Sequence, residues 1–198
     1  MTDISAQMVK ELRYRTGAGM MDAKKALQKN KGDMEKAIKT LREEGLAKAD
    51  KKSARQANEG IVECYVHAGG KIGVMVEINC ETDFVARTDD FKQLCHDVAM
   101  HIAAANPLFL KKEEVDQKTL DEEKDIYIKQ AQAEGKPEDI ATKIAAGKMA
   151  KYYEQNCLLE QSFIKDPDRT INDLIVDSVA KMGENIQIRR FARFQLGQ

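Results

Sequence analysis

The sequence carries almost no net charge, because 32 basic and 33 acidic side chains among 198 residues leave a formal charge of -1. Proteins that bind nucleic acid through phosphate contacts, or an anionic membrane surface, are usually more basic. The sequence also lacks an apolar run as long as a bilayer span, and its first residues lack the apolar core of a signal peptide. We therefore expect a soluble, cytoplasmic protein that binds neither nucleic acid nor a membrane.

Cysteine is scarce and never closely paired. The four cysteines, Cys64, Cys80, Cys95 and Cys157, lie far apart without a Cys-x-x-Cys pair. Metal sites usually combine such pairs with nearby histidines. His96 and His101 are five positions apart and fall on different faces of an expected helix. The sequence therefore predicts no metal site.

The motifs of common nucleotide-binding and catalytic sites are absent as well. The chain has neither a Gly-x-Gly-x-x-Gly motif nor a phosphate-binding Gly-x-x-x-x-Gly-Lys-Ser/Thr loop. No serine or cysteine is accompanied by a recognisable base. We expect a binding protein that uses no cofactor, does not bind nucleotide directly and is not an enzyme.

The first part of the sequence has the apolar spacing of helices. Apolar residues at spacings of three and four predict three short helices in the first 45 residues, with Asp33 capping the third before it ends at Gly45. Residues 46–58 are basic and alanine-rich, which favours a separate helical linker. Met20 and Met21 lie at the bend between the first two helices, so two interpretations stay open. They belong to the core of this bundle, or they form a patch that faces a partner.

Alternating apolar residues near both ends of the chain predict a three-stranded antiparallel sheet. Residues 60–79 have the pattern of a hairpin that turns at Ala68-Gly69-Gly70-Lys71. An isolated hairpin is only marginally stable, so residues 186–194 are expected to add the third strand. That strand is rich in arginine and phenylalanine, which is also typical of a basic-aromatic surface for nucleic acid. A sheet with one charged solvent face explains the same residues more simply.

The middle of the chain predicts a pair of long helices. Residues 113–133 and a second segment from Glu138 towards Cys157 are strongly charged and thinly apolar, and Gly135-Lys136-Pro137 forms a turn between them. We expect an antiparallel hairpin that projects from the core and meets another protein. Residues 166–170 are then expected to cap a final helix.

Together these elements predict an α+β protein in four parts. Residues 1–53 form the helical bundle with its linker helix, and residues 54–115 form the core α/β part. Residues 116–157 form the helical hairpin, and residues 158–198 return to the core with the C-terminal strand.

The most unusual chemistry lies at the corner between the second strand and the helix that follows it. Thr82, Asp83, Phe84 and Val85 occupy this corner, where rigidly held binding residues often gather. One interpretation is structural, with Phe84 and Val85 as a hydrophobic staple and Asp83 as a helix cap. The other is that the same side chains wait for a partner.

Two motifs make the sequence resemble a known family. The corner lies in Asn79-Cys80-Glu81-Thr82-Asp83-Phe84-Val85-Ala86-Arg87. An earlier segment runs Leu12-Arg13-Tyr14-Arg15-Thr16-Gly17-Ala18-Gly19-Met20-Met21-Asp22-Ala23-Lys24-Lys25-Ala26-Leu27. Both resemble signatures of bacterial-type elongation factor Ts, in the expected order. The similarity continues through Gly147-Lys148-Met149 and Gly183-Glu184-Asn185-Ile186, so it covers essentially the whole chain.

The resemblance implies a guanine-nucleotide exchange factor that binds the GTPase elongation factor Tu and releases its GDP. In this family the corner enters the nucleotide domain of the GTPase and is associated with displacement of Mg²⁺. By matching positions, Phe84 is the wedge, Asp83 is the polar contact, and Thr82 and Val85 shape the corner. The family also carries an N-terminal bundle of the ubiquitin-associated type, which makes Met20 and Met21 candidates for docking.

The chain departs from the longer family pattern, which has a second α/β subdomain. Only one hairpin and one Thr-Asp-Phe-Val corner are present here. A homodimer could restore the missing surface, so pairing of two copies is one expectation. A second hypothesis is a helical adaptor or RNA-associated module that uses the bundle and the basic C-terminal strand. Release of GDP from a preloaded GTPase distinguishes the two hypotheses, since an adaptor gives none.

Overall fold

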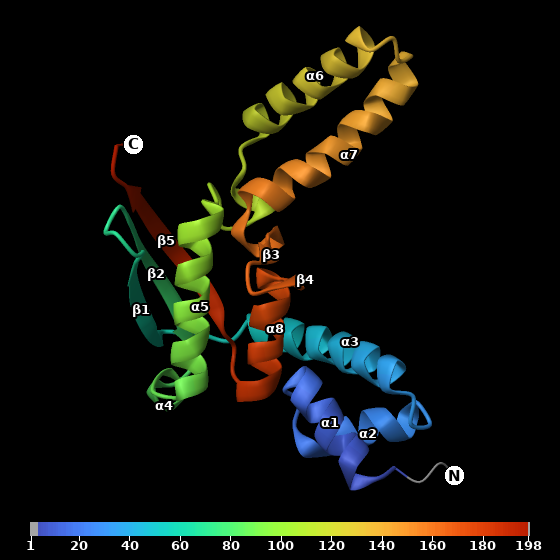
Figure 1. Ribbon diagram of the computed structural model, residues 1–198, viewed down its shortest axis with the longest axis vertical. Coiled ribbons are helices and arrows are strands. Elements are labelled where there is room, and N and C mark those ends of the chain that lie inside the picture. Colours follow the sequence, from blue (N-terminus) through green and yellow to red (C-terminus); the bar gives the residue numbers. More distant parts are fainter. Residues whose placement is uncertain (1–3, 198) are drawn as a thin grey trace. The chain divides into compact units, whose positions relative to one another are not determined.

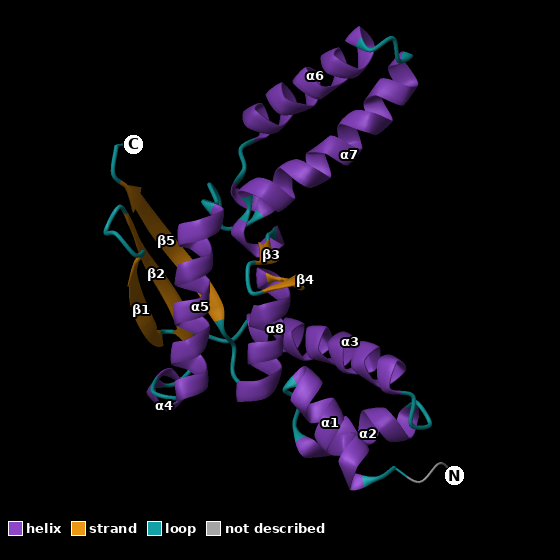
Figure 2. Ribbon diagram, viewed as in Figure 1, coloured by secondary structure: helices purple, strands orange, loops and turns teal. Residues whose placement is uncertain are grey.

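The computed structural model describes residues 4–197, and its elements are shown in Figures 1 and 2. The chain divides into two compact units. The first contains the described residues up to Glu63, Val76–His96 and Asp173–Arg189, and the second contains Cys64–Met75, Asp97–Asn172 and the residues from Arg190 onwards. Residues 1–3 and 198, at the ends of the expected parts 1–53 and 158–198, lie outside the described residues. The four-part division itself stays a prediction.

The predicted three-helix bundle is confirmed in the first unit. It consists of α1 (Ala6–Thr16), α2 (Met20–Lys29) and α3 (Met34–Ser53). Their buried side chains form one small apolar core made of Val9, Leu12, Ala23, Ala26, Leu27 and Ala37. The Asp33 side chain accepts a hydrogen bond from the Lys36 N–H at 3.0 Å, so the predicted cap of α3 is also confirmed.

The predicted end of the third helix is wrong. α3 continues through Gly45 to Ser53, so the expected linker is largely the second half of the same helix. Gly45 is buried, and a Cβ there would touch Val176 at 3.7 Å and Ala180 at 3.9 Å. A glycine at this position therefore allows close packing against α8 (Ile171–Met182) rather than ending the helix.

The predicted α+β class and three-stranded antiparallel sheet are confirmed. β1 (Glu59–Val66), β2 (Ile72–Cys80) and β5 (Gln187–Gln195) pair in the order β1-β2-β5, with β2 in the centre. Alternate β2 side chains are buried, as expected from their pattern: Val74, Val76 and Ile78. Apolar residues that recur in the sequence at spacings of three and four form the buried stripe of α5 (Asp89–Ala105): Phe91, Leu94, Val98 and Ile102.

One arginine of β5 has a structural partner. The Arg193 guanidinium donates from Nε and Nη2 to the Ala103 carbonyl of α5, at 3.3 and 3.2 Å, and from Nη2 to Gln195 at 2.8 Å. These bonds fit the simpler interpretation of this strand as part of the sheet.

The second unit contains the predicted helical hairpin, formed by α6 (Gln117–Ala133) and α7 (Glu138–Asn156) and visible in Figure 1. The expected start of its first helix at Glu113 is wrong. Lys112–Glu114 form a 3₁₀ turn, η1, and the Asp116 side chain caps α6 by accepting from the Thr119 N–H at 2.9 Å. The buried residues of the two helices are small alanines, Ala131, Ala141 and Ala145. Nζ of Lys148 on α7 also donates to Oε1 of Gln130 on α6 at 2.8 Å.

Residues 166–170 belong to a small hairpin that the sequence did not predict. They directly precede α8, and their role as its cap stays a prediction. After a 3₁₀ turn, η2 (Leu158–Glu160), β3 (Ser162–Phe163) pairs antiparallel with β4 (Asp166–Thr170), and α8 follows directly. The short polar strand β4 has no apolar alternation by which the sequence could have revealed it. Among residues 4–197, none of the helices combines the length and apolar character that a membrane span requires.

Candidate functional site

The corner between β2 and α5 contains a single helical turn, α4 (Asp83–Ala86). Its N-cap is Thr82, whose backbone is extended and whose hydroxyl accepts from the Val85 N–H at 3.4 Å. The interpretation of Asp83 as a helix cap is therefore wrong, because Asp83 is already the first helical residue.

Phe84 is exposed at the tip of this corner. Its exposed fraction is 79%, whereas phenylalanine is usually among the buried residues of a soluble protein. Neighbouring Ala86 is only 7% exposed and Val85 is half-buried, so α4 is anchored by its other side chains. A hydrophobic staple would require Phe84 to pack on its own fold, and the structure does not support that interpretation.

The Asp83 carboxylate lies beside Phe84 at the surface. Its Oδ2 accepts from Nη2 of Arg87 at 2.8 Å, and the two side chains are 45% and 78% exposed. An exposed pair of this kind contributes at most about 1 kcal/mol to stability. A partner that offered Asp83 a better donor could therefore break the pair at little cost.

The backbone before α4 is held by the carboxylate of Glu184, which lies two residues after the end of α8. Oε2 of Glu184 accepts from the Glu81 N–H and the Thr82 N–H, each at 3.0 Å. Oε1 of Glu184 accepts from the Thr82 hydroxyl at 2.6 Å. Because the hydroxyl gives its only proton to Glu184, its lone pairs are left for the Val85 N–H.

A second carboxylate completes this arrangement from the other side. Oε1 of Glu81 accepts from the Asn185 N–H at 2.6 Å and from Nη1 of Arg55 at 3.4 Å. Nδ2 of Asn185 donates to the carbonyl of Arg55 at 2.8 Å and to that of Ser53 at 3.4 Å. The corner, the end of α8 and the chain that leaves α3 therefore share one hydrogen-bonded network within the first unit.

Sequence reasoning missed these contacts. Glu184 and Asn185 entered it only as part of a family resemblance, and Glu81 only as a member of the corner motif. No periodic pattern connects residues a hundred positions apart. The available signal was a polar pair directly after Gly183, since a glycine often follows the last residue of a helix.

The other predicted binding residues lie on the helical bundle. Met20 and Met21 are 60% and 63% exposed, and Tyr14 of α1 is 91% exposed. The interpretation that places the two methionines in the core is therefore wrong. The structure leaves them as surface residues, and their role in docking stays a prediction.

Reactive groups are not gathered at the corner. Burial raises the pKa of the Cys80 thiol to about 11, with a smaller contribution from the Glu184 charge, and raises that of Cys95 to about 12. Both side chains are therefore protonated, unreactive thiols at neutral pH. Within residues 4–197, no cluster of histidine, cysteine, aspartate and glutamate could hold a metal ion.

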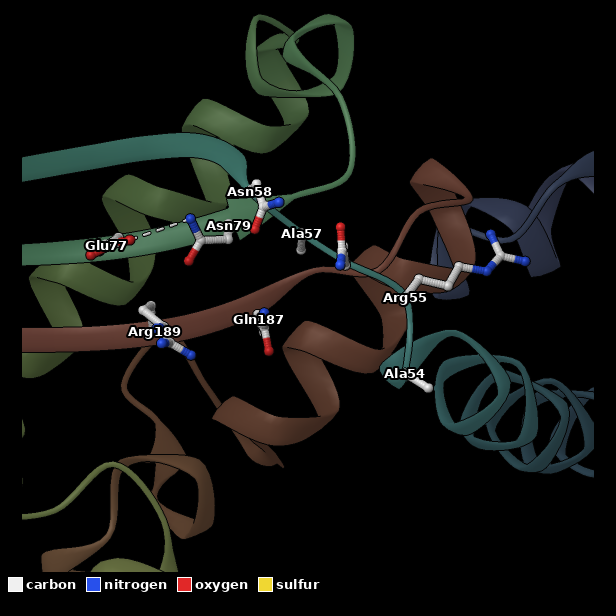
Figure 3. A pocket seen from close by; sticks show the side chains of 9 residues that line it. Ala54, Arg55, Ala57, Asn58, Glu77, Asn79, Gln187 and Arg189 are labelled. Carbon is white, nitrogen blue, oxygen red and sulfur yellow. Dashed lines mark hydrogen bonds between the residues drawn. The ribbon is translucent and has the colours of Figure 1, made fainter.

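A pocket with a volume of about 400 Å³ opens nearby in the first unit (Figure 3). Its lining is polar and carries both signs of charge: Ala54, Arg55, Gln56, Ala57, Asn58, Glu77, Asn79, Gln187 and Arg189. Nδ2 of Asn79 donates to Glu77 at 3.4 Å and to the carbonyl of Glu59 at 3.2 Å. The side chain of Arg55 is directed away from the other labelled residues. This lining offers no serine, threonine, cysteine or histidine that could act as a nucleophile.

Comparison with known proteins supports one family. The family model described as "Elongation factor TS" matches residues 4–198. Elongation factor Ts of Thermoanaerobacter sp. (strain X514) is 57% identical over 195 residues, which cover 98% of this chain and 96% of the relative. Elongation factor Ts of Syntrophomonas wolfei is 58% identical, with coverage of 98% and 91%. Elongation factor Ts of Desulfitobacterium hafniense is 58% identical over 198 residues, with coverage of 100% and 91%.

Proposed function

Because the chain belongs to the elongation factor Ts family and is thus an elongation factor of protein synthesis, we propose that it is the guanine-nucleotide exchange factor of elongation factor Tu. It binds the GDP form of that GTPase, disturbs the Mg²⁺ and phosphate site, and releases GDP. The observation that carries the proposal is an exposed phenylalanine, Phe84, on a corner whose backbone is held by hydrogen bonds. Such a role places the protein in the cytoplasm, where translation takes place.

The corner supplies the contacts with the GTPase. A GTPase of this kind holds GDP through backbone N–H groups and a bound Mg²⁺, so displacing either one weakens nucleotide binding. Phe84 enters the nucleotide domain as a wedge, and Asp83 supplies a polar contact beside it. Thr82 and Val85 shape the corner. Because the corner is already ordered, little conformational entropy is lost when it binds.

No bond is made or broken in this process. A protein that prefers the nucleotide-free GTPase must weaken nucleotide binding, and nucleotide must weaken its own binding by the same factor. GTP can then displace the factor after GDP has left. The protein acts without a cofactor, without binding nucleotide itself and without enzymatic chemistry of its own.

The bundle contributes affinity rather than the exchange step. Exposed Met20 and Met21 offer flexible apolar side chains, which adapt well to a partner surface. We assign them to docking on the same GTPase.

Pairing of two copies belongs to the same proposal. A second copy could replace the surface that the longer family pattern provides through its second subdomain. If a homodimer forms the active surface, GDP release per chain falls on dilution, in step with dissociation measured by sedimentation equilibrium. A stable monomer with full activity would remove pairing from the proposal.

The test uses elongation factor Tu loaded with a fluorescent GDP analogue and chased with unlabelled GDP. Adding the protein should speed the loss of fluorescence in proportion to its concentration until the rate saturates. A GTPase of another family, loaded in the same way, is the specificity control and should not respond. Binding without faster release would indicate the adaptor hypothesis instead, and binding to RNA alone would indicate an RNA-associated module.

A further inference from the structure

Three hydrogen bonds converge on one carboxylate at the corner. Oε2 of Glu184 accepts two backbone N–H groups at 3.0 Å, and Oε1 accepts the Thr82 hydroxyl at 2.6 Å. All three donors belong to Glu81 and Thr82, the residues directly before α4. Hydrogen bonds to an ionised carboxylate are roughly twice as strong as those between neutral groups. The carboxylate therefore fixes the backbone from which α4 and Phe84 project.

The turn that ends α8 places the Glu184 side chain beside the corner. Gly183 has a φ of +83° and its N–H donates to the Val179 carbonyl at 3.0 Å, which ends the helix in a left-handed turn. Glu184 follows at once, and the next residue, Asn185, is 5% exposed. The Asn185 N–H donates to Oε1 of Glu81 at 2.6 Å. Each of the two segments thus offers a carboxylate to the backbone of the other.

Cationic side chains lie near the two carboxylates. Nη1 of Arg55 lies 3.4 Å from Oε1 of Glu81. Burial lowers the pKa of the Lys52 ammonium group, at the end of α3, while the charges of Glu81 and Glu184 act in the opposite direction. Both cations belong to the same unit as the corner.

We propose that Glu184 is a positioning residue for nucleotide exchange, because its carboxylate holds residues 81–82 so that Phe84 is presented to the GTPase. The inference rests on the proposed function. Glu184 acts through Phe84 and needs no contact with the GTPase itself. Without the carboxylate the corner samples further conformations, and only the fraction that presents Phe84 correctly supports exchange.

The decisive variant is Glu184→Gln, which keeps the size of the side chain but replaces one accepting oxygen with an amide NH₂ that cannot accept. All three donors lose an ionised acceptor. An NH₂ group in the place of Oε1 can only donate to the Thr82 hydroxyl, and one in the place of Oε2 faces two N–H donors. The maximal rate of GDP release should fall about tenfold, which corresponds to about 1.4 kcal/mol. The concentration that gives half of the maximal rate should hardly change, because docking by the bundle is untouched. Glu113→Gln is the matched control, since Glu113 is exposed on η1, outside the bundle, and the same charge is lost.

A purely structural role would produce a different pattern. It would lower the melting temperature and leave the maximal rate of the folded protein unchanged. The double variant Glu184→Gln with Phe84→Ala separates the two roles further. If Glu184 acts through Phe84, the Glu184→Gln change should have almost no effect on release once Phe84 is absent. An equal fold-change in both backgrounds would overturn the positioning role.

Amide hydrogen exchange provides a measurement that does not depend on the GTPase. Exchange at the backbone N–H groups of Glu81 and Thr82 should become faster in Glu184→Gln and stay unchanged in Glu113→Gln. Unchanged amide protection at these two residues would also overturn the proposal. If Glu184→Gln does not fold, Glu184→Asp keeps the charge on a shorter side chain and should give an intermediate loss of rate. An Asp variant with the full rate and loosened amides would count against the proposal.

A wrong exchange function and a wrong positioning role give different results. If the unaltered protein releases no GDP from elongation factor Tu, the proposed function is wrong and the positioning role is wrong with it. If the unaltered protein is active and Glu184→Gln is equally active, the exchange function stands and only the role of Glu184 is wrong.

Discussion

Replacing Phe84 by alanine tests whether this side chain serves the fold or a partner. A phenylalanine buried in its own core costs about 3–5 kcal/mol when truncated, which is a large part of the stability of a typical domain. Phe84 is 79% exposed, so most of its ring loses no contact with the protein when it is removed. We expect the free energy of unfolding to change by no more than about 0.5 kcal/mol.

The effect on GDP release should be much larger than the effect on stability. Burying an exposed phenylalanine side chain in a partner contributes about 1.5–3 kcal/mol, which is about ten- to a hundredfold in an equilibrium constant. If that energy is used in displacing the nucleotide, Phe84→Ala lowers the rate of release by a similar factor. Asp83 and the wider interface supply the rest of the acceleration, so Asp83→Ala should also lower the rate.

The assay measures the melting temperature and fluorescent GDP release on the same sample of each variant. Phe91→Ala is the matched control, because this phenylalanine lies seven positions later, on α5, and is completely buried. It should lose about 3–5 kcal/mol of stability. A large fall in the melting temperature of Phe84→Ala would return Phe84 to a structural role. Unchanged release by a fully folded Phe84→Ala protein would refute its role as the wedge.

Other parts of the structure lead to further predictions. Replacing Met20 and Met21 together by alanine should raise the concentration needed for half-maximal GDP release by about ten- to a hundredfold. The maximal rate should be retained. An unchanged titration would remove their docking role. Burial lowers the pKa of His101 below its ordinary value of 6.5. The unfolded chain therefore binds a proton at this imidazole more readily than the folded protein does. The free energy of unfolding should fall as the pH drops below about 6.5. Urea titrations of wild type and His101→Gln at several pH values check this, since the variant should lose that part of the pH dependence. Gly60→Ala should destabilise the sheet by about 2 kcal/mol or more, measured by urea titration, because φ is +141° and a Cβ would collide with the Ile78 carbonyl. Gly73→Ala is its control, since a Cβ there would meet open space.

Local patterns in the sequence were enough to predict most elements. The alternation in β2 and the apolar stripe of α5 predicted a strand and a helix face that the structure confirms. Asp33 was a reliable cap signal because an aspartate can satisfy a free N–H group at the start of a helix without any tertiary contact. These features depend only on residues a few positions apart.

The errors arose where distant residues decide the local structure. Gly45 has the appearance of a helix end, but the surface of α8 packs against it and α3 continues. Likewise, Asp83 is a residue type that often caps helices. The cap is nevertheless Thr82, one position earlier, and Glu184 from 102 positions away orients its hydroxyl. Neither contact leaves a periodic trace in the sequence.

The residues of the candidate site could be predicted from the sequence, but the hydrogen bonds that hold them could not. The corner residues Thr82 to Val85 were found because they match a family motif, and their exposure could not be known until the fold was described. The carboxylates that hold the corner were not found, because a hydrogen bond to a backbone N–H group places no demand on the side chain of its donor.

The most direct test of the exchange function is turnover at low stoichiometry. Elongation factor Tu carrying fluorescent GDP is mixed with excess GTP and with a small molar fraction of the protein, and the total GDP released is followed to completion. An exchange factor is displaced by GTP and acts again, so all of the GDP should be released, at a rate proportional to the amount of protein added. Extra release that stops once it equals the amount of protein added, or no extra release at all, would contradict the account.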